Sequence, residues 1–246
     1  MYSAALEREM PYKAYLPRGY DSGEERYPVL YMLHGYGGGY GEWEHYGLFD
    51  AATRAIDAGL VPPMIIVTPE GDLGYWMDHA DDGPRYGTYA GRDVLAHIDA
   101  EYRTRATRAS RAIGGLSMGA DGALDLAFHN ARAFSIIGAH SVVLRTKSEA
   151  PYFFGDRKYF EAYDPMSIVR DYGDRVRDAD FTIWLDSGET DPWLPRAQAL
   201  EALLRAQGIP HEWRLYGGDH EGGYWQAHLD DYLAFYGEAF RARNPG

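Results

Sequence analysis

Short runs of apolar residues recur along the chain, and stretches with helical spacing separate them. Five runs predict buried strands, at residues 27–33, 64–67, 112–113, 134–137 and 181–185. Because most of these runs are unbroken rather than alternating, they are typical of parallel strands that are covered on both faces. Residues 211–216 alternate more and are expected nearer a sheet edge, and residues 12–16 are expected to add an edge strand.

Helical patterns lie between the predicted strands. Residues 194–207 place four apolar side chains on one face, and Gly208 and Pro210 then end the helix. A last helix is expected to carry one core-facing stripe, made of Trp225, Leu229, Tyr232, Leu233, Tyr236 and Phe240. Strands that alternate with helices predict an α/β fold, with a mostly parallel, doubly wound sheet and helices on both faces.

The pattern loosens at residues 142–179. This stretch holds an aromatic loop at 151–155 and a short helix expected over 167–172. A connection of this length inside a compact domain is often a lid over a site. We therefore expect residues 1–246 to form a single domain with a lid insertion at about 142–179.

Composition and charge narrow the possible partners. A chain of 246 residues suits one domain, and its net charge of −13 disfavours nucleic acid and anionic membrane surfaces. The absence of cysteine excludes disulfides, thiolate zinc sites and a cysteine nucleophile. No signal peptide or membrane span is visible, so we expect a cytoplasmic protein, or a secreted one if a leader has been removed. The carboxylates and imidazole at 78–82 match no metal motif, so we expect a solvated acidic loop and neither metal nor cofactor.

The sharpest chemical signal is Gly115-Leu116-Ser117-Met118-Gly119, which fits the G-x-S-x-G pattern. A strand is expected to end just before it, and a helix is expected to follow. On such a turn a serine stands exposed above the sheet, and side chains at the two glycine positions would collide with neighbouring backbone. This context disfavours a chance match, so Ser117 is predicted to be a nucleophile.

A second signal is the glycine-rich stretch at residues 34–39, directly after a central strand. Hydrolases with a G-x-S-x-G turn take one oxyanion donor from such a loop and another from the residue after the nucleophile. We expect the N–H groups of Tyr36 and Met118 to form this oxyanion hole. The alternative is an ordinary glycine-rich turn, and a phosphate loop is disfavoured because no Gly-Lys-Ser/Thr follows.

A serine hydroxyl also needs an imidazole that accepts its proton. His220 lies in a glycine-rich loop between the last strand and the last helix, which is where hydrolases with this motif order carry the base. His140 is the best alternative, because His211 and His228 are expected within a strand and a helix.

The acid that orients the imidazole is expected after the strand at 181–185, where three carboxylates follow. Asp191 lies furthest into this loop and is favoured. Asp186, which ends the strand, is the first alternative, and Glu189 is the second.

These motifs in combination resemble one known family. They are the segments 15–17 and 27–35, the Ser117 motif, the acidic loop 186–191, and the late His220 with Trp225. Over nearly its whole length the chain resembles the putative esterase (esterase D-like) family, which includes feruloyl and acetyl xylan esterases and S-formylglutathione hydrolases. The resemblance implies the α/β-hydrolase fold and the catalytic triad Ser117, Asp191 and His220.

Together these features predict a cofactor-free serine carboxylic ester hydrolase that works through an acyl-enzyme. Within the same fold the alternative is an acyltransferase, and from a different class it is a catalytically silent binding module. Aromatic residues expected around Ser117 favour a small-molecule ester with a hydroxycinnamoyl (feruloyl-type), other aryl or sugar-linked group. The predicted substrate-binding residues are Trp76, Trp193, Tyr224 and Trp225.

Overall fold

A seven-stranded sheet forms the centre of the computed structural model, which describes residues 1–244. The strand order is β3-β5-β4-β6-β7-β8-β9, and only β3 runs antiparallel to its neighbour among these described strands. The strands are β3 (Tyr12–Tyr15), β4 (Val29–Leu33), β5 (Ile65–Pro69), β6 (Arg111–Leu116), β7 (Ile136–His140), β8 (Thr182–Gly188) and β9 (Glu212–Tyr216). A separate antiparallel ribbon pairs β1 (Tyr2–Ser3) with β2 (Arg8–Glu9).

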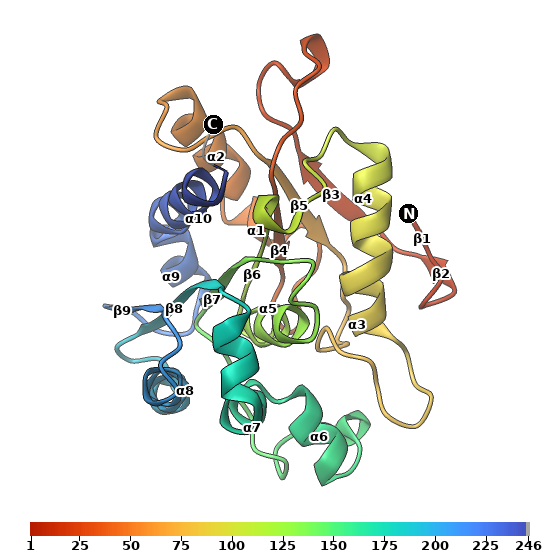
Figure 1. Cartoon of the computed structure of the whole chain (residues 1–246), viewed down its shortest axis with the longest axis vertical. Helices are drawn as coiled ribbons and strands as arrows, with labels where there is room; N and C mark the ends of the chain where they lie inside the picture. The colour runs from red at the N-terminus through yellow and green to blue at the C-terminus, as the bar shows by residue number, and fades with distance from the viewer. Residues whose placement is uncertain (245–246) are drawn as a thin grey trace.

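Helices cover both faces of this sheet (Figure 1). One layer holds α1 (Glu42–His45), α2 (Leu48–Asp57), α9 (Gly222–Ala227) and α10 (Leu229–Arg243). The other holds α3 (Tyr86–Thr88), α4 (Leu95–Glu101), α5 (Met118–His129), α6 (Arg157–Tyr163), α7 (Pro165–Asp178) and α8 (Leu194–Ala206). Within residues 1–244, no helix has the length and apolar content required to cross a bilayer.

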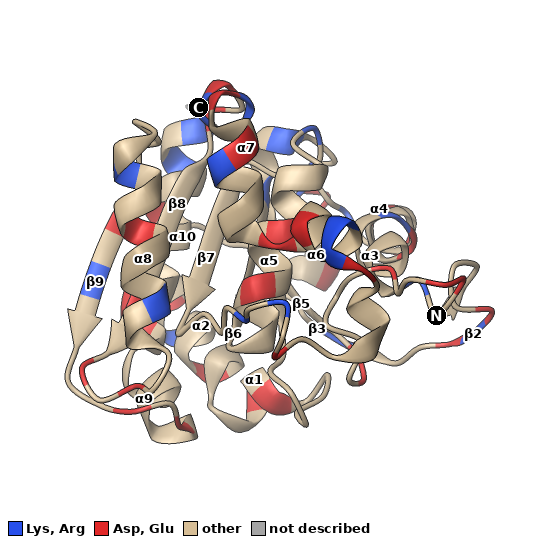
Figure 2. Cartoon of the chain, turned by 90° about the horizontal axis from the view of Figure 1, so that it is seen from below, with Lys and Arg blue, Asp and Glu red and all other residues tan. Residues whose placement is uncertain are grey.

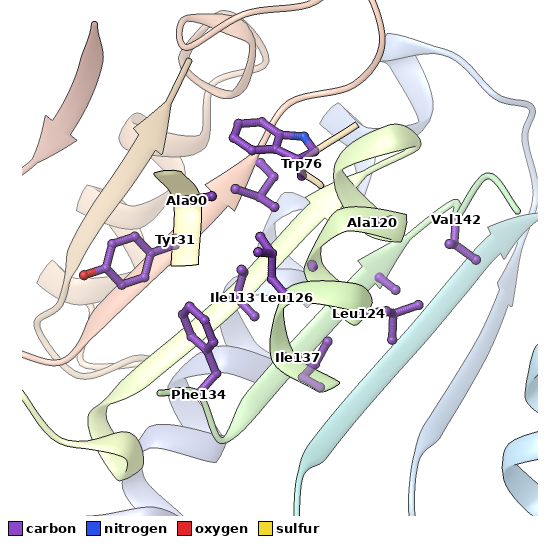
Figure 3. Packing of buried hydrophobic residues seen from close by; sticks show 14 of the residues in the cluster. Tyr31, Trp76, Ala90, Ile113, Ala120, Leu124, Leu126, Phe134, Ile137 and Val142 are labelled. Carbon is purple, nitrogen blue, oxygen red and sulfur yellow. The ribbon is translucent and has the colours of Figure 1, made fainter. Parts of the chain in front are cut away.

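Each central strand supplies apolar side chains to both layers, because successive side chains of a strand point to opposite faces. In β4, Leu30 and Met32 pack in the layer of α2 and α10, whereas Leu33 packs in the layer of α5. Figure 3 shows the α5 side of this core, where Ile113 and Ile137 of adjacent strands lie beneath the helix. This two-sided burial explains the unbroken apolar runs, and the predicted α/β architecture is confirmed.

The end of the chain differs from the expected single helix. All six residues of the predicted stripe are buried, but they belong to two helices, α9 and α10. His228 interrupts the helical backbone with φ −108° and ψ 11°, and its ring stacks on Tyr216 at a centroid distance of 4.0 Å. An apolar stripe with helical spacing does not reveal a break of this kind, because both helices face the same layer.

The connection from β7 to β8 contains α6 and α7. Helix α7 packs against α5 and α8, as the crossover helix between two parallel strands does. Its first turn is capped by Asp164, whose carboxylate accepts a hydrogen bond from the N–H of Ser167 at 3.0 Å. The expected short helix at 167–172 lies in the first part of α7, which ends at a kink where Tyr172 has the non-helical angles φ −132° and ψ 28°. A lid role for residues 142–179 stays a prediction.

Candidate active site

Ser117 stands on the turn between β6 and α5. Its φ of 56° and ψ of −116° lie in a region that residues other than glycine rarely adopt. A Cβ at Gly115 would lie 2.4 Å from backbone atoms of Gly119, and a Cβ at Gly119 would lie 2.3 Å from the carbonyl oxygen of Leu33. The two glycines of the motif are therefore required sterically, and the tight turn they allow presents Ser117 at the carboxyl end of the sheet.

The hydroxyl of Ser117 faces the imidazole of His220. Ser117 Oγ lies 2.9 Å from His220 Nε2, and His220 Nδ1 lies 2.9 Å from Asp191 Oδ2. His220 lies in the loop between β9 and α9, and Asp191 lies in the loop between β8 and α8. The structure thus brings together three residues whose loops all follow carboxyl ends of parallel strands.

The carboxyl group of Asp191 is held in its ionised form. Burial alone would raise its pKa, but the hydrogen bonds from His220 and from the N–H of Trp193 hold the pKa below its ordinary value. The N–H of Trp193 donates to Oδ1 at 2.7 Å, while Oδ2 faces His220. One oxygen of Asp191 therefore fixes the start of α8, and the other is available to the imidazole.

The glycine-rich loop after β4 passes directly beside Ser117. A Cβ at Gly35 would lie 3.5 Å from the Cβ of Ser117. The loop turns at Tyr36, because the N–H of Gly38 donates to the carbonyl oxygen of Gly35 at 3.1 Å. Met118 is the first residue of α5, so no preceding helical turn supplies an acceptor for its N–H. An oxyanion hole formed by the N–H groups of Tyr36 and Met118 stays a prediction.

Two carboxylates that sequence reasoning missed hold this loop in place. Glu42 accepts a hydrogen bond from the N–H of Gly35 at 2.7 Å. Glu70 accepts one from the N–H of Tyr40 at 3.2 Å, and its Oε1 lies 3.2 Å from His34 Nε2. Burial alone would raise the pKa of Glu70, but the hydrogen bonds lower it to about 2. No motif marks either residue, since their partners are backbone groups and a histidine that only the fold brings near.

Three of the four predicted substrate-binding aromatics are buried. Trp76 is fully buried, and its ring packs 5.0 Å from that of His34. Tyr224 is buried and donates a hydrogen bond to Asp186 at 2.8 Å. Trp76 is 0% exposed and Tyr224 is 4% exposed, so neither ring presents more than a trace of surface, and a contact of either with substrate stays a prediction.

Trp225 is also buried, and its ring meets that of His220 edge-to-face at 5.1 Å. This contact supports the imidazole, and a role of Trp225 in substrate binding stays a prediction. Trp193 is half-buried. Tyr36, which follows Gly35 in the loop beside Ser117, is 59% exposed, and its ring lies 5.8 Å from that of Tyr75.

Asp186 and His140, the alternatives considered for acid and base, form a separate pair. His140 Nδ1 lies 2.7 Å from Asp186 Oδ2, and both side chains are fully buried. Asp186 also accepts hydrogen bonds from Trp184 Nε1 at 2.8 Å and from the hydroxyl of Tyr232 at 3.1 Å. This network joins the ends of β7 and β8 to α10, while the Ser117 hydroxyl is paired with His220.

The acidic segment at 78–82 has a structural contact at its first residue. Asp78 accepts hydrogen bonds from the N–H of Thr88 at 2.7 Å and from its hydroxyl at 2.6 Å. In the described part of the chain, residues 1–244, no three His, Asp or Glu side chains are grouped so that they could hold a metal ion.

The parallel sheet, the strained serine turn and the loops that carry His220 and Asp191 define an α/β hydrolase. The chain belongs to the family described as "Putative esterase", whose model matches residues 3–236.

Individual relatives agree with this family. Esterase Rv1288 and Esterase MT1326, from two strains of Mycobacterium tuberculosis, are each 35% identical over 238 residues, which cover 83% of this chain and 51% of the relative. The chain thus spans about half the length of these curated relatives. A solved ferulic acid esterase is 27% identical, with a TM-score of 0.87 over 97% of this chain and 96% of that chain. An S-formylglutathione hydrolase from Agrobacterium tumefaciens shares the fold, with a TM-score of 0.80 and 21% identity over 98% of this chain and 93% of that one.

Proposed function

We propose that the protein is a serine carboxylic ester hydrolase that acts through an acyl-enzyme. The observation that carries this proposal is the hydrogen-bonded line from Ser117 Oγ through His220 to Asp191, with 2.9 Å at each step. A serine becomes a useful nucleophile when an adjacent base takes its proton and a third group orients that base. Membership of an esterase family supports ester chemistry at this serine.

In the proposed first half-reaction, Ser117 Oγ attacks the ester carbonyl carbon and His220 Nε2 accepts the hydroxyl proton. Asp191 holds the imidazole in the required orientation and stabilises its charged form. Negative charge develops on the carbonyl oxygen, and the N–H groups of Tyr36 and Met118 stabilise it. The N-terminus of α5 adds a favourable partial positive charge, because Met118 begins that helix.

His220 then returns the proton to the leaving alcohol oxygen, which leaves the acyl group bonded to Ser117 Oγ. In the second half-reaction, His220 takes a proton from water, and the resulting nucleophile attacks the acyl carbonyl. Collapse of this intermediate releases the carboxylic acid and returns the proton to Ser117. Every proton in the cycle therefore passes through His220 Nε2.

We further propose that aryl acyl esters, including hydroxycinnamoyl (feruloyl-type) and sugar-linked esters, are the preferred substrates. Similarity to a ferulic acid esterase supports this choice. Tyr36, in the loop that passes Ser117, has an exposed ring next to that of Tyr75, which offers a flat apolar surface. A good aromatic contact contributes about 0.5–1.5 kcal/mol beyond area burial.

Product analysis tests the proposed reaction. The wild-type protein and Ser117→Ala are incubated with methyl ferulate and with 4-nitrophenyl acetate, with and without an added alcohol. We expect the wild type to release free acid in both cases, and Ser117→Ala to be about 10³-fold slower or more. Acyl transfer to the alcohol in place of acid release would indicate an acyltransferase. Absence of any acyl cleavage by the wild type would contradict the proposal.

A further inference from the structure

A pocket of about 550 Å³ opens between residues 144–148 and helices α6, α7 and α8. Five of its fourteen lining residues are basic and two are acidic, although the whole chain has a net charge of −13. Figure 2 shows Lys and Arg on α6 and α8, which border this pocket. Four lining residues are apolar: Leu144, Phe160, Met166 and Ala199. The pocket therefore combines a cationic character with an apolar surface.

Three of the five basic residues are already paired with carboxylates. These pairs are Arg157 with Glu161 at 3.4 Å, Arg170 with Asp171 at 2.8 Å, and Arg196 with Glu149 at 2.6 Å. The side chains of the other two, Arg145 and Lys147, form no ion pair or hydrogen bond to any residue in 1–244. Both are half-buried. They are the two cations of the pocket that have no carboxylate partner in that range.

Asp121, in the first turn of α5, is the carboxyl group that interacts electrostatically with Arg145. Burial, together with the nearby carboxyl groups of Asp125 and Asp164, raises the pKa of Asp121 well above its ordinary value. No ion pair joins Asp121 to Arg145 within residues 1–244, and the raised pKa of Asp121 further weakens it as a partner for the guanidinium group.

Arg145 also lies next to the catalytic loops. Its Cζ is 4.9 Å from the ring centroid of Tyr75 and 5.3 Å from that of Trp193. The N–H of Val143 approaches the carbonyl oxygen of Ser117 at 3.4 Å, and two residues of extended chain span at most about 7 Å. Arg145 thus belongs to the pocket lining and is only two residues along the chain from Val143, whose backbone contacts Ser117.

We infer that Arg145 and Lys147 form an anion-binding subsite beside Ser117, which selects esters whose acyl or alcohol part ends in a carboxylate. The inference rests on the proposed esterase function. A guanidinium group matches a carboxylate geometrically with two parallel hydrogen bonds, and an ammonium group adds a second, more mobile charge. The apolar lining residues contact the body of the substrate between its ester bond and its carboxylate.

Two matched pairs of esters test this subsite. In the first pair the acyl group carries the charge, and 4-nitrophenyl hydrogen adipate is compared with its neutral amide, 4-nitrophenyl adipamate. In the second pair the leaving alcohol carries it, and 4-acetoxybenzoate is compared with 4-acetoxybenzamide. The ratio of kcat/KM for the charged ester to kcat/KM for the neutral one is measured within each variant, so a general loss of activity cancels.

We expect Arg145→Gln to lower this ratio about 10-fold, and Lys147→Gln about 3-fold, for the pair whose carboxylate reaches the pocket. Added salt should lower the wild-type ratio as well, because ions screen the attraction. The pair of esters whose ratio falls also shows whether the acyl part or the alcohol part of the substrate occupies the pocket.

Arg54→Gln is the matched control. It also removes one positive charge, but from an exposed position on α2, in the opposite helix layer. It should leave both ratios unchanged. If neither pair changes its ratio in Arg145→Gln and Lys147→Gln while the neutral esters are hydrolysed, the subsite is overturned and the esterase function stands. If the wild type hydrolyses none of the four esters, the proposed function is overturned, and the subsite with it.

Discussion

Asp186 Oδ2 lies 2.7 Å from His140 Nδ1, and both side chains are fully buried near the strand ends beside Ser117. A second pair, Asp191 and His220, has nearly the same geometry at 2.9 Å, but there the imidazole is 18% exposed. The two aspartate–histidine pairs therefore share their chemistry and differ in access to solvent. This difference predicts a structural role for the first pair and a catalytic role for the second.

Asp186→Asn is expected to lower the free energy of unfolding by about 3 kcal/mol, because it disrupts a buried carboxyl group that receives several hydrogen bonds. Urea denaturation of the variant and the wild type measures this change. A loss below about 0.5 kcal/mol would contradict the structural role.

Asp191→Asn is expected to lower kcat for ester hydrolysis by up to about 10⁴-fold, because asparagine favours the wrong imidazole tautomer. Steady-state kinetics measure this loss, and the folded fraction is checked by circular dichroism. Glu189→Gln, in the same loop, is the matched control and should retain nearly full activity. If Asp191→Asn proves mild and Asp186→Asn abolishes activity without unfolding, the roles of the two pairs are reversed.

Gly119→Ala is expected to destabilise the protein by at least about 3 kcal/mol, because the new Cβ would meet backbone oxygens of Leu33 and His34 that cannot move independently. Gly37→Ala provides the comparison. Gly37 has φ +78° but open space around the added Cβ, so the substitution should cost only about 1–2 kcal/mol. Equal stability of the two variants in urea titrations would contradict the steric account of the serine turn.

Much of this architecture could be predicted from sequence because the relevant signals are local. An unbroken apolar run such as residues 64–67 indicates a strand buried on both faces, and β5 occupies this part of the chain. The G-x-S-x-G motif predicts a tight turn at the serine, because the turn leaves no room for a side chain at positions 115 and 119. His220 and Asp191 could be chosen from chain order, because loops after parallel strands meet at one edge of the sheet.

The remaining features depend on long-range packing. The sequence around Trp76 does not reveal whether its ring faces a cleft or the core, and it lies in the core. Glu70 acts on backbone groups near Tyr40, and Arg145 lies between rings that are distant from it in the chain. Such contacts are specified only by the folded chain, so composition and spacing do not predict them.

The lowered pKa of Glu70 predicts how the free energy of unfolding depends on pH. Its pKa is lowered to about 2 in the folded protein, so its contribution to stability is complete above its unfolded value of about 4.5. The contribution is lost as the pH falls from about 4.5 towards 2. The difference in unfolding free energy between the wild type and Glu70→Gln should therefore shrink between about pH 6 and pH 3. A difference that stays constant or grows over this pH interval would contradict a stabilising role of the ionised Glu70 carboxylate.

The proposed preference for aryl esters is tested by comparing kcat/KM for methyl ferulate with that for 4-nitrophenyl acetate, butyrate and decanoate. We expect ferulate turnover, and a decline in kcat/KM from acetate to decanoate, because a flat aromatic surface favours a planar group over a long flexible chain. A preference for decanoate without detectable ferulate hydrolysis would contradict the substrate class and leave the esterase function intact.

Covalent labelling by a fluorophosphonate tests whether Ser117 is an activated nucleophile, because the reagent reacts with a serine that a neighbouring base has activated. Intact-mass analysis and peptide mapping are carried out on the wild type, Ser117→Ala and His220→Ala after the same exposure. We expect one adduct per wild-type chain, located on Ser117, no adduct on Ser117→Ala, and strongly slowed labelling of His220→Ala. Labelling of Ser117→Ala equal to that of the wild type, or no adduct on a folded wild-type protein, would contradict this role of Ser117.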